Sequence, residues 1–146
     1  MKADNLLTKQ IGAPAIRDLL KLFSIEQERH FFEELEKCIE KHFNLKDFCF
    51  VSSSRLDEVN QEKMRVLAGR KRINAQFWKR AKELPRDDVF HHVGDKKNQH
   101  FFLITLTPGL DESIKQILVD LIDEYFSLMS KIEELKKNQD LIYMIS

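Results

Sequence analysis

From Leu110 to Ser146 the chain contains no glycine and no proline, and its apolar residues recur with a helical period. Two interleaved series, each with a spacing of seven residues, fill the a and d positions of a heptad. They are Leu121, Leu128, Leu135 and Ile142, and between them Leu118, Tyr125, Ile132 and Gln139. We therefore predict one long helix that uses this seam for homodimerisation and signal transmission.

A second apolar stripe lies on another side of the same helix and is shorter. It consists of Val119, Ile122, Phe126 and Met129, and it ends because Glu133 and Lys136 occupy the next two places. We expect the helix to close a domain as far as Met129 and then to leave it as a stalk. The predicted organisation is a helical lead-in over 1–24, a domain over 25–129, and a coiled-coil linker over 130–146 leading to an output domain.

The composition is that of a single domain with an ordinary core. The chain has 146 residues, 42% of them hydrophobic, and a formal net charge of zero, so the total charge gives no reason to expect nucleic acid. The first residues lack the apolar core of a signal peptide, and no run reaches the roughly 20 apolar residues that span a bilayer. Two cysteines are too few for a disulfide framework. We expect a cytoplasmic protein without a membrane partner.

Periodicity upstream of the long helix predicts alternating groups of helices and strands. Helical spacing over 16–23 is followed by Ser24 and Gln27, which have the form of a capping box and place a second helix start at Ile25. Strands are expected over 47–54, 63–69, 89–93 and 101–107, a short helix over 73–81, and a turn longer than two residues over 94–98. This order predicts an α+β fold with a small antiparallel sheet of about four strands, flanked by N-terminal helices and the long C-terminal helix.

Two segments carry a family likeness. DFCFVSSSRLDEVNQEKMRVLAG over 47–69 and HFFLITLTPGLDESIKQILVDLIDEYF over 100–126, together with the preceding amphipathic helix, resemble a GAF domain. In that family a helix precedes the first hairpin, and the last strand passes into a helix that dimerises and continues to an output domain. The short stretch between Phe43 and Leu110 implies a reduced version of the fold.

The tail KIEELKKNQDLIYMIS is similar to the linker that commonly precedes a GGDEF (diguanylate cyclase) domain. The resemblance implies a sensory domain in cyclic di-GMP signalling that regulates a covalently linked cyclase and has no enzymatic activity of its own. A histidine kinase or another output fits the stalk nearly as well. No Asn-Lys-x-x-x-x-Phe pattern or bilin-type cysteine is present, so no motif supports a small-molecule ligand, although one stays possible.

A basic segment, GRKRINAQFWKRAKELPR over 69–86, offers an anion or partner surface. The candidate residues are Arg70, Lys71, Arg72, Trp78, Lys79 and Arg80, with Trp78 available for stacking. The alternative, which we favour, is a solvated helix face whose Phe77 and Trp78 pack inward. A protein-interaction module that docks an acidic partner or its own output domain through this surface is our second functional hypothesis.

Metal-binding and catalytic candidates are few. Cys38 and His42 share a helix face, but no second pair at suitable spacing completes a zinc site, and both lie on the core-facing stripe. His91 and His92 must point to opposite faces of a strand, so at most one can join His100. A hydrolase or metal enzyme using His91, His100 or Cys49 is our third hypothesis. We expect no catalytic residues, no metal and no cofactor.

Overall fold

The computed structural model describes residues 12–43, 45, 47–55, 64–107 and 110–145, and for 141–143 and 145 it describes the backbone only. Five α-helices, two 3-10 helices and one sheet are present in this part of the chain. The predicted α+β class, with a four-stranded antiparallel sheet and a long C-terminal helix, is confirmed. In chain order the elements are α2 (Ala13–Lys21), η1 (Leu22–Ser24), α3 (Glu28–His42), β1 (Phe48–Ser53), β2 (Arg65–Ala68), η2 (Arg70–Arg72), α4 (Ala75–Glu83), α5 (Arg86–Val89), β3 (Phe90–Lys96), β4 (Gln99–Thr105) and α6 (Glu112–Ile145).

The sheet has the strand order β2-β1-β4-β3, so the first and last strands of the chain lie together in its centre. Every neighbouring pair is antiparallel, and Phe50 of β1 lies opposite Leu103 of β4. All six residues of β1 are buried. A strand covered on both faces reads as a continuous apolar run, which is the pattern of this segment in the sequence.

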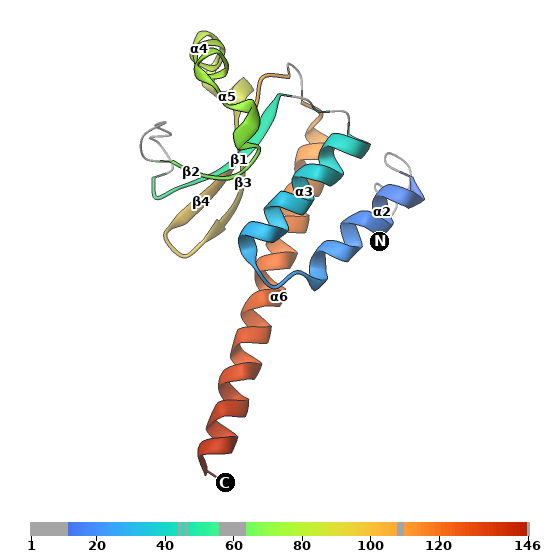
Figure 1. The fold of residues 1–146 in the computed structure, drawn as a ribbon, viewed down its shortest axis with the longest axis vertical. Helices are drawn as coiled ribbons and strands as arrows, with labels where there is room; N and C mark the ends of the chain where they lie inside the picture. The colour runs from blue at the N-terminus through green and yellow to red at the C-terminus, as the bar shows by residue number, and fades with distance from the viewer. Residues whose placement is uncertain (1–11, 44, 46, 56–63, 108–109, 146) are drawn as a thin grey trace.

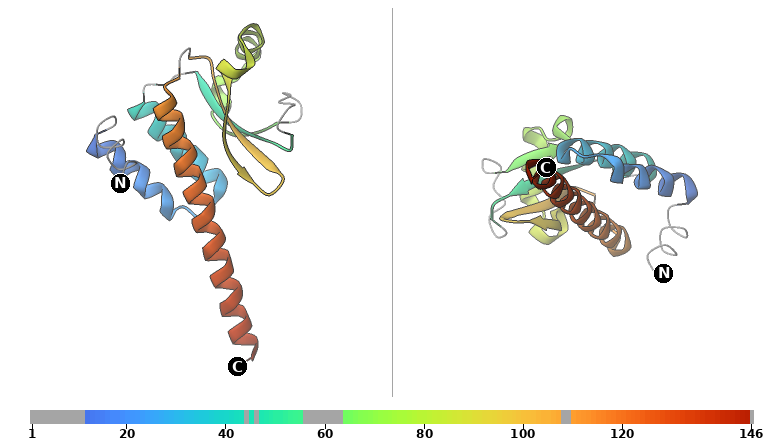
Figure 2. Two further views of the ribbon diagram at one scale, coloured as in Figure 1. Left: turned by 180° about the vertical axis from the view of Figure 1, so that it is seen from behind. Right: turned by 90° about the horizontal axis from the view of Figure 1, so that it is seen from below.

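Helices α3 and α6 cover one face of the sheet, which we call the inner face, and α2 lies on the far side of α3 (Figures 1 and 2). Alternate strand residues, among them Phe48, Phe50 and Phe101, point into this layer and form the main core with both helices. Leu19 and Leu22 of the N-terminal segment are buried in the same core. The part of the predicted lead-in that the structure describes is therefore packed with the domain.

Helices α4 and α5 cover part of the opposite face, which we call the outer face. Phe77, Trp78 and Ala81 of α4 pack there against the intervening strand residues, including Cys49 and Phe102. Helix α4 begins at a conventional cap, because the Asn74 side chain accepts a hydrogen bond of 2.9 Å from the backbone of Phe77. The sheet is thus the middle of three layers.

Two local predictions were wrong. Ser24 does not cap α3; its hydroxyl donates a hydrogen bond of 2.8 Å to the carbonyl of Lys21, and α3 begins at Glu28 without a side-chain cap. Ser24 is instead the last residue of η1, and residues 25–27 connect η1 to α3. The β3–β4 turn has only two residues, because Lys96 pairs with Gln99. The first of the two, Lys97, adopts a left-handed conformation with φ 54°. An early left-handed residue lets a two-residue turn follow the twist of the strands.

No helix in the described ranges combines the length and the apolar character required to cross a bilayer.

Candidate functional site

The first half of α6 is held in the domain by one continuous stripe. Leu118, Ile122 and Tyr125 are almost completely buried, and Met129 packs partly buried at the end of the same line. The hydroxyl of Tyr125 donates a hydrogen bond of 2.7 Å to the backbone carbonyl of Ile25. This half of the helix therefore belongs to the core.

The assignment of Leu118 and Tyr125 to a dimer seam was wrong. Both side chains are 1% exposed or less and contact α3 and the sheet within one copy of the chain. The stripe that faces the domain takes Leu118 and Tyr125 from the predicted seam, and Ile122 and Met129 from the second apolar stripe. Its spacings of three and four residues follow the 3.6-residue period of a helix. Leu121, also predicted in the seam, packs partly buried against the core cluster.

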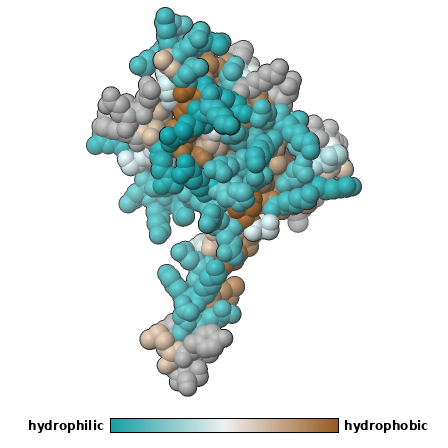
Figure 3. Space-filling model, viewed as in Figure 1, coloured by the Kyte–Doolittle hydropathy of each residue, from teal (hydrophilic) through white to brown (hydrophobic). Residues whose placement is uncertain are grey.

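The second half of α6 extends beyond the domain (Figures 1 and 2). Leu128 and Ile132 are half-buried, whereas Leu135 is 63% exposed and Met144 is 83% exposed. Figure 3 shows this projecting part as largely hydrophilic, with hydrophobic side chains between the polar ones. Lys136 forms an ion pair of 3.5 Å with Glu26 and is the last residue of the helix with a recorded contact to the rest of the described chain. Ile142 lies in the helix, but its side chain is outside the described residues.

Two of the six candidates in the basic segment serve the fold instead. Arg72 bridges Glu36 at 3.3 Å and Glu40 at 2.7 Å, and its guanidinium lies 4.7 Å from the centre of the Phe48 ring. Trp78 is 8% exposed and meets Phe77 edge to face in the core of the outer face. Their assignment to an anion or stacking surface was wrong, because both side chains already have partners inside the chain.

The other four basic candidates are available at the surface. They are Arg70, Lys71, Lys79 and Arg80, all of them exposed. None of the four forms an ion pair with another residue that the structure describes. Arg70 and Lys71 belong to η2 and line a hollow shared with α3, whereas Lys79 and Arg80 belong to α4. The exposed basic charge is thus smaller than the sequence suggested, is divided between two elements, and does not include the ring of Trp78 for stacking.

The histidines divide as the alternation of the strand predicts. His91 faces the α6 side, where it is 8% exposed and its Nε2 lies 3.2 Å from the carbonyl oxygen of Asp88. His92 faces the outer side, where it meets His100. Burial lowers the pKa of His91, and Lys115 lowers it further, against the opposing hydrogen bond to Asp88.

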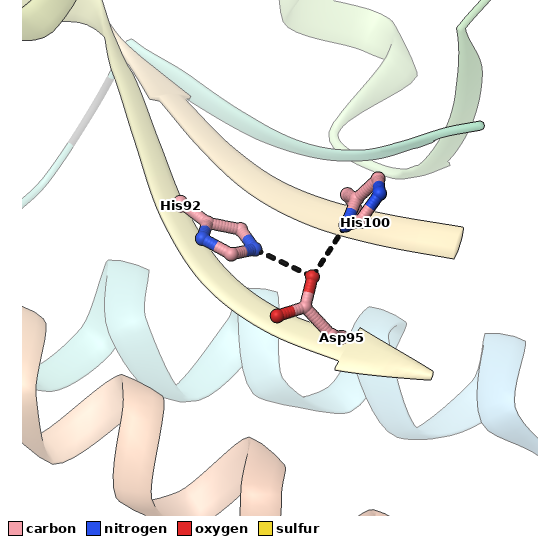
Figure 4. A group of neighbouring side chains, drawn as sticks. All are labelled: His92, Asp95 and His100. Atoms are coloured by element: carbon pink, nitrogen blue, oxygen red, sulfur yellow. Dashed lines mark hydrogen bonds and ion pairs between the residues drawn. The ribbon is translucent and has the colours of Figure 1, made fainter. Parts of the chain in front are cut away.

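Between His92 and His100 stands an aspartate that the sequence analysis did not single out. The Oδ1 atom of Asp95 lies 2.7 Å from His92 Nε2 and 2.5 Å from His100 Nδ1 (Figure 4). Although partial burial alone would raise it, the two histidine hydrogen bonds hold the pKa of Asp95 below its ordinary value. The sequence places Asp95 three residues from His92, where regular alternation would send it to the other face.

The remaining candidates, Cys38, His42 and Cys49, have surroundings that do not form a metal or catalytic site. His42 Nε2 lies 2.8 Å from Asp18 Oδ2, and among the described residues Cys38 and His42 belong to no group of three metal-ligand atoms that all lie within 4.8 Å of one another. Cys49 is fully buried, and this burial raises the pKa of its thiol to about 12. A thiol with such a pKa carries no useful fraction of thiolate near neutrality, so Cys49 is not a nucleophile in this fold.

The space between the sheet and the helices is filled by aromatic rings. Phe32 stands at the centre, with its ring 5.2 Å from Phe31, 5.4 Å from Phe50 and 5.5 Å from Phe101. Phe126 continues the network from α6 at 4.9 Å from Phe101. A ligand would have to displace these rings to enter the core, so binding at the surface is the easier alternative.

Comparison of the chain with protein-family models, with curated proteins and with solved structures found no match.

Proposed function

We propose that this chain is a regulatory domain that self-associates through the projecting half of α6 and passes a signal along it to a covalently linked output domain. One observation carries the proposal: a helix of 34 residues is anchored in the core by its first half and extends into solvent with its second. Leu135 is 63% exposed on that part, and Leu128 and Ile132 are half-buried on the same seam. An exposed apolar stripe on a free helix is stabilised by a second helix.

The anchoring of α6 gives the signal a route. Helix α6 contacts the inner face at β3, where a Cβ atom at Gly94 would lie only 2.9 Å from Ile122 Cγ2. The same turns of the helix contact α3 through Tyr125. A packed contact this close has little room to deform, so a displacement of β3 or α3 is passed to the helix as a whole.

The order of the elements supports a reduced GAF-like domain as the identity of this module. A helix precedes the first hairpin, and the last strand passes within a few residues into the long helix. By the same resemblance the output is a diguanylate cyclase of the GGDEF type, so that the protein acts in the cytoplasm in cyclic di-GMP signalling and is itself no enzyme. The helix would serve a histidine kinase in the same way.

The input in this proposal arrives at the surface. The aromatic packing around Phe32 favours a partner or a surface-bound ligand over a metabolite held in the core. A hollow where α6 leaves the domain is lined by Phe126, Met129 and Ile132 with charged residues around them. Occupation of that hollow would act directly on the point where the anchored half of α6 becomes the stalk.

The test is the oligomeric state of the full chain, measured by sedimentation velocity over a concentration series. We expect a dimer that Leu135→Asp weakens at least about tenfold, because a charge at a d position is desolvated in the dimer only. Lys137→Asp is the matched control, since it places the same carboxylate on the opposite side of the same turn and should leave the dimer intact. A monomer at all concentrations, or equal effects of the two variants, would refute the proposal.

A second function is favoured by the four exposed basic residues. Arg70, Lys71, Lys79 and Arg80 suit an acidic partner or an acidic face of the output domain. Titration with a polyglutamate peptide should show binding that weakens with salt and is lost in Lys79→Glu/Arg80→Glu. Binding that is unchanged by the double substitution would exclude this surface.

A further inference from the structure

The β3–β4 hairpin carries three side chains with metal-ligand atoms on its outer face. His92 Nε2, Asp95 Oδ1 and His100 Nδ1 all lie within 4.8 Å of one another, and the structure shows no other such group of three or more in the ranges it describes. Figure 4 shows both imidazoles turned toward the Asp95 carboxylate from the two strands. The arrangement is neither buried nor fully open, with side-chain exposures of 38% for His92, 53% for Asp95 and 26% for His100.

A β-bulge in β3 creates this convergence. His92 pairs with Phe102 and Gly94 with Phe101, so Val93 is an extra residue in the ladder. Val93 is fully buried in the inner core, and the bulge turns Asp95 to the same face as His92. A bulge of this kind re-aims a side chain without disturbing the rest of the strand.

The pairing of the strands supplies the third group. Asp95 lies directly opposite His100 in the ladder, and His100 is two residues from Phe102, the partner of His92. The three side chains are therefore direct and diagonal neighbours on one face of the sheet. The strand pairing by itself brings them close enough to touch. The Phe102 ring lies 5.4 Å from that of His92 and gives the group an apolar floor.

We propose that His92, Asp95 and His100 bind a divalent first-row transition-metal ion, with zinc as the leading candidate. Two imidazole nitrogens and a carboxylate oxygen are a donor set that zinc uses in sites with three protein ligands and an open position for water. The inference does not depend on the proposed dimerisation, because the group lies on the face of the sheet opposite α6.

The present geometry differs from that of a metal-bound site in the distances between the ligand atoms, which are shorter here. Ligand atoms around a tetrahedral zinc ion with bonds of about 2.1 Å are separated by about 3.4 Å. The atoms here are closer, at 2.7 Å and 2.5 Å, because Asp95 accepts hydrogen bonds where the ion would stand. Small rotations of partly exposed side chains open this space, and the ion then takes the place of the protons between the ligands.

Metal titration of the full chain, first stripped with a chelator, tests the proposal. Calorimetry with zinc should give one site per chain, and cobalt should develop the visible absorption of a low-symmetry site with nitrogen and oxygen ligands. Asp95→Asn, His92→Gln and His100→Gln should each weaken zinc binding at least about tenfold, and His92→Gln/His100→Gln should abolish it. Zinc should raise the melting temperature of the unsubstituted chain and leave that of the double variant unchanged.

Two control variants locate the site. His30→Gln removes an exposed imidazole from α3, and Cys38→Ala removes a thiol that belongs to no group of three metal-ligand atoms in the described chain. Both should bind zinc as the unsubstituted chain does. Absence of saturable binding by zinc and cobalt would overturn the proposal and leave a metal-free hydrogen-bonded group. Undiminished binding by a double variant that circular dichroism shows to be folded would overturn it as well.

Discussion

The rings of Phe31 and Tyr125 lie face to face, with their centroids 3.7 Å apart and their planes 4° from parallel. This contact joins α3 to α6 at the level where the long helix still belongs to the domain. Tyr125 also reaches the backbone carbonyl of Ile25, so a single side chain connects α6 with the segment that precedes α3 and with the first turn of α3. Together with the buried Leu118 and Ile122, Tyr125 therefore holds the first half of α6 in the domain.

Substitution of Tyr125 should therefore show two separate effects on stability. Tyr125→Phe keeps the stacked ring and loses the hydrogen bond to Ile25, which should reduce the free energy of unfolding by about 1 kcal/mol. Tyr125→Ala also removes the ring from the core and should reduce it by about 3–5 kcal/mol. Urea denaturation measures both values, and similar losses for the two variants would show that the stacked ring contributes little.

Gly94 should be intolerant of even one added methyl group. Its Cβ would lie 2.9 Å from Ile122 Cγ2, and that atom belongs to a short branched side chain that is fully buried. We expect Gly94→Ala to destabilise the domain by about 1–3 kcal/mol through overpacking.

A double-mutant cycle separates this clash from a change in strand conformation. In an Ile122→Ala background the space is open, so Gly94→Ala should cost much less than it does in the unsubstituted chain. Equal losses in both backgrounds would mean that the close approach of β3 to α6 is not the reason for the glycine.

The sequence predicted the architecture because the central strands carry apolar residues on both faces of the sheet. Phe48 and Phe50 face α3 while Cys49 and Val51 face α4, and the same alternation runs through β4. The long helix was also evident, yet the division of its residues between core and seam was not. Leu118 and Tyr125 fit a heptad as well as they fit a domain-facing stripe, and only the position of α3 decides between the two.

The His92–Asp95–His100 group could be anticipated only in part. The alternation of the strand allowed one histidine of the pair at 91 and 92 to meet His100, and His92 is that residue. Asp95 was missed because its orientation depends on the bulge at Val93. The adjacent Gly94 is a residue typical of bulges, but it was assigned to a turn over 94–98. Likewise, Arg72 was counted with the free charges because its partners Glu36 and Glu40 lie on α3, far away in the chain.

The stability of the domain should fall in mild acid because of His91. Burial first, and then Lys115, lower its pKa from the ordinary 6.5, whereas the Asp88 carbonyl and the carboxylates of Glu112 and Asp88 oppose the shift. Just below pH 6.5 the unfolded chain therefore binds a proton that the folded chain resists. Stability is lost as the pH falls through this window toward the lower folded-state pKa.

The measurement is the urea midpoint between about pH 7.5 and about pH 5.5. His91→Gln should make the decline in this range shallower, since the substituted side chain cannot titrate. His30→Gln, on the exposed face of α3, should leave the decline as it is in the unsubstituted chain. An identical pH profile for His91→Gln would assign the decline to other groups.

Shortening α6 should distinguish the part that stabilises the domain from the part for which we propose a role in self-association. Removal of residues 137–146 takes away no contact with the domain that the structure records, so the monomeric domain should melt as before while self-association is lost.

Removal of residues 130–146 also takes away the half-buried Ile132 and the ion pair of Lys136 with Glu26. The ion pair is exposed on both sides and contributes little, so we expect a loss of about 1 kcal/mol, mainly from Ile132. Ile132→Ala in the 1–136 fragment should reproduce most of that difference. Equal melting temperatures for the two fragments would place the end of the domain at Met129, and loss of cooperative melting in the longer fragment would show that the projecting half is needed for folding.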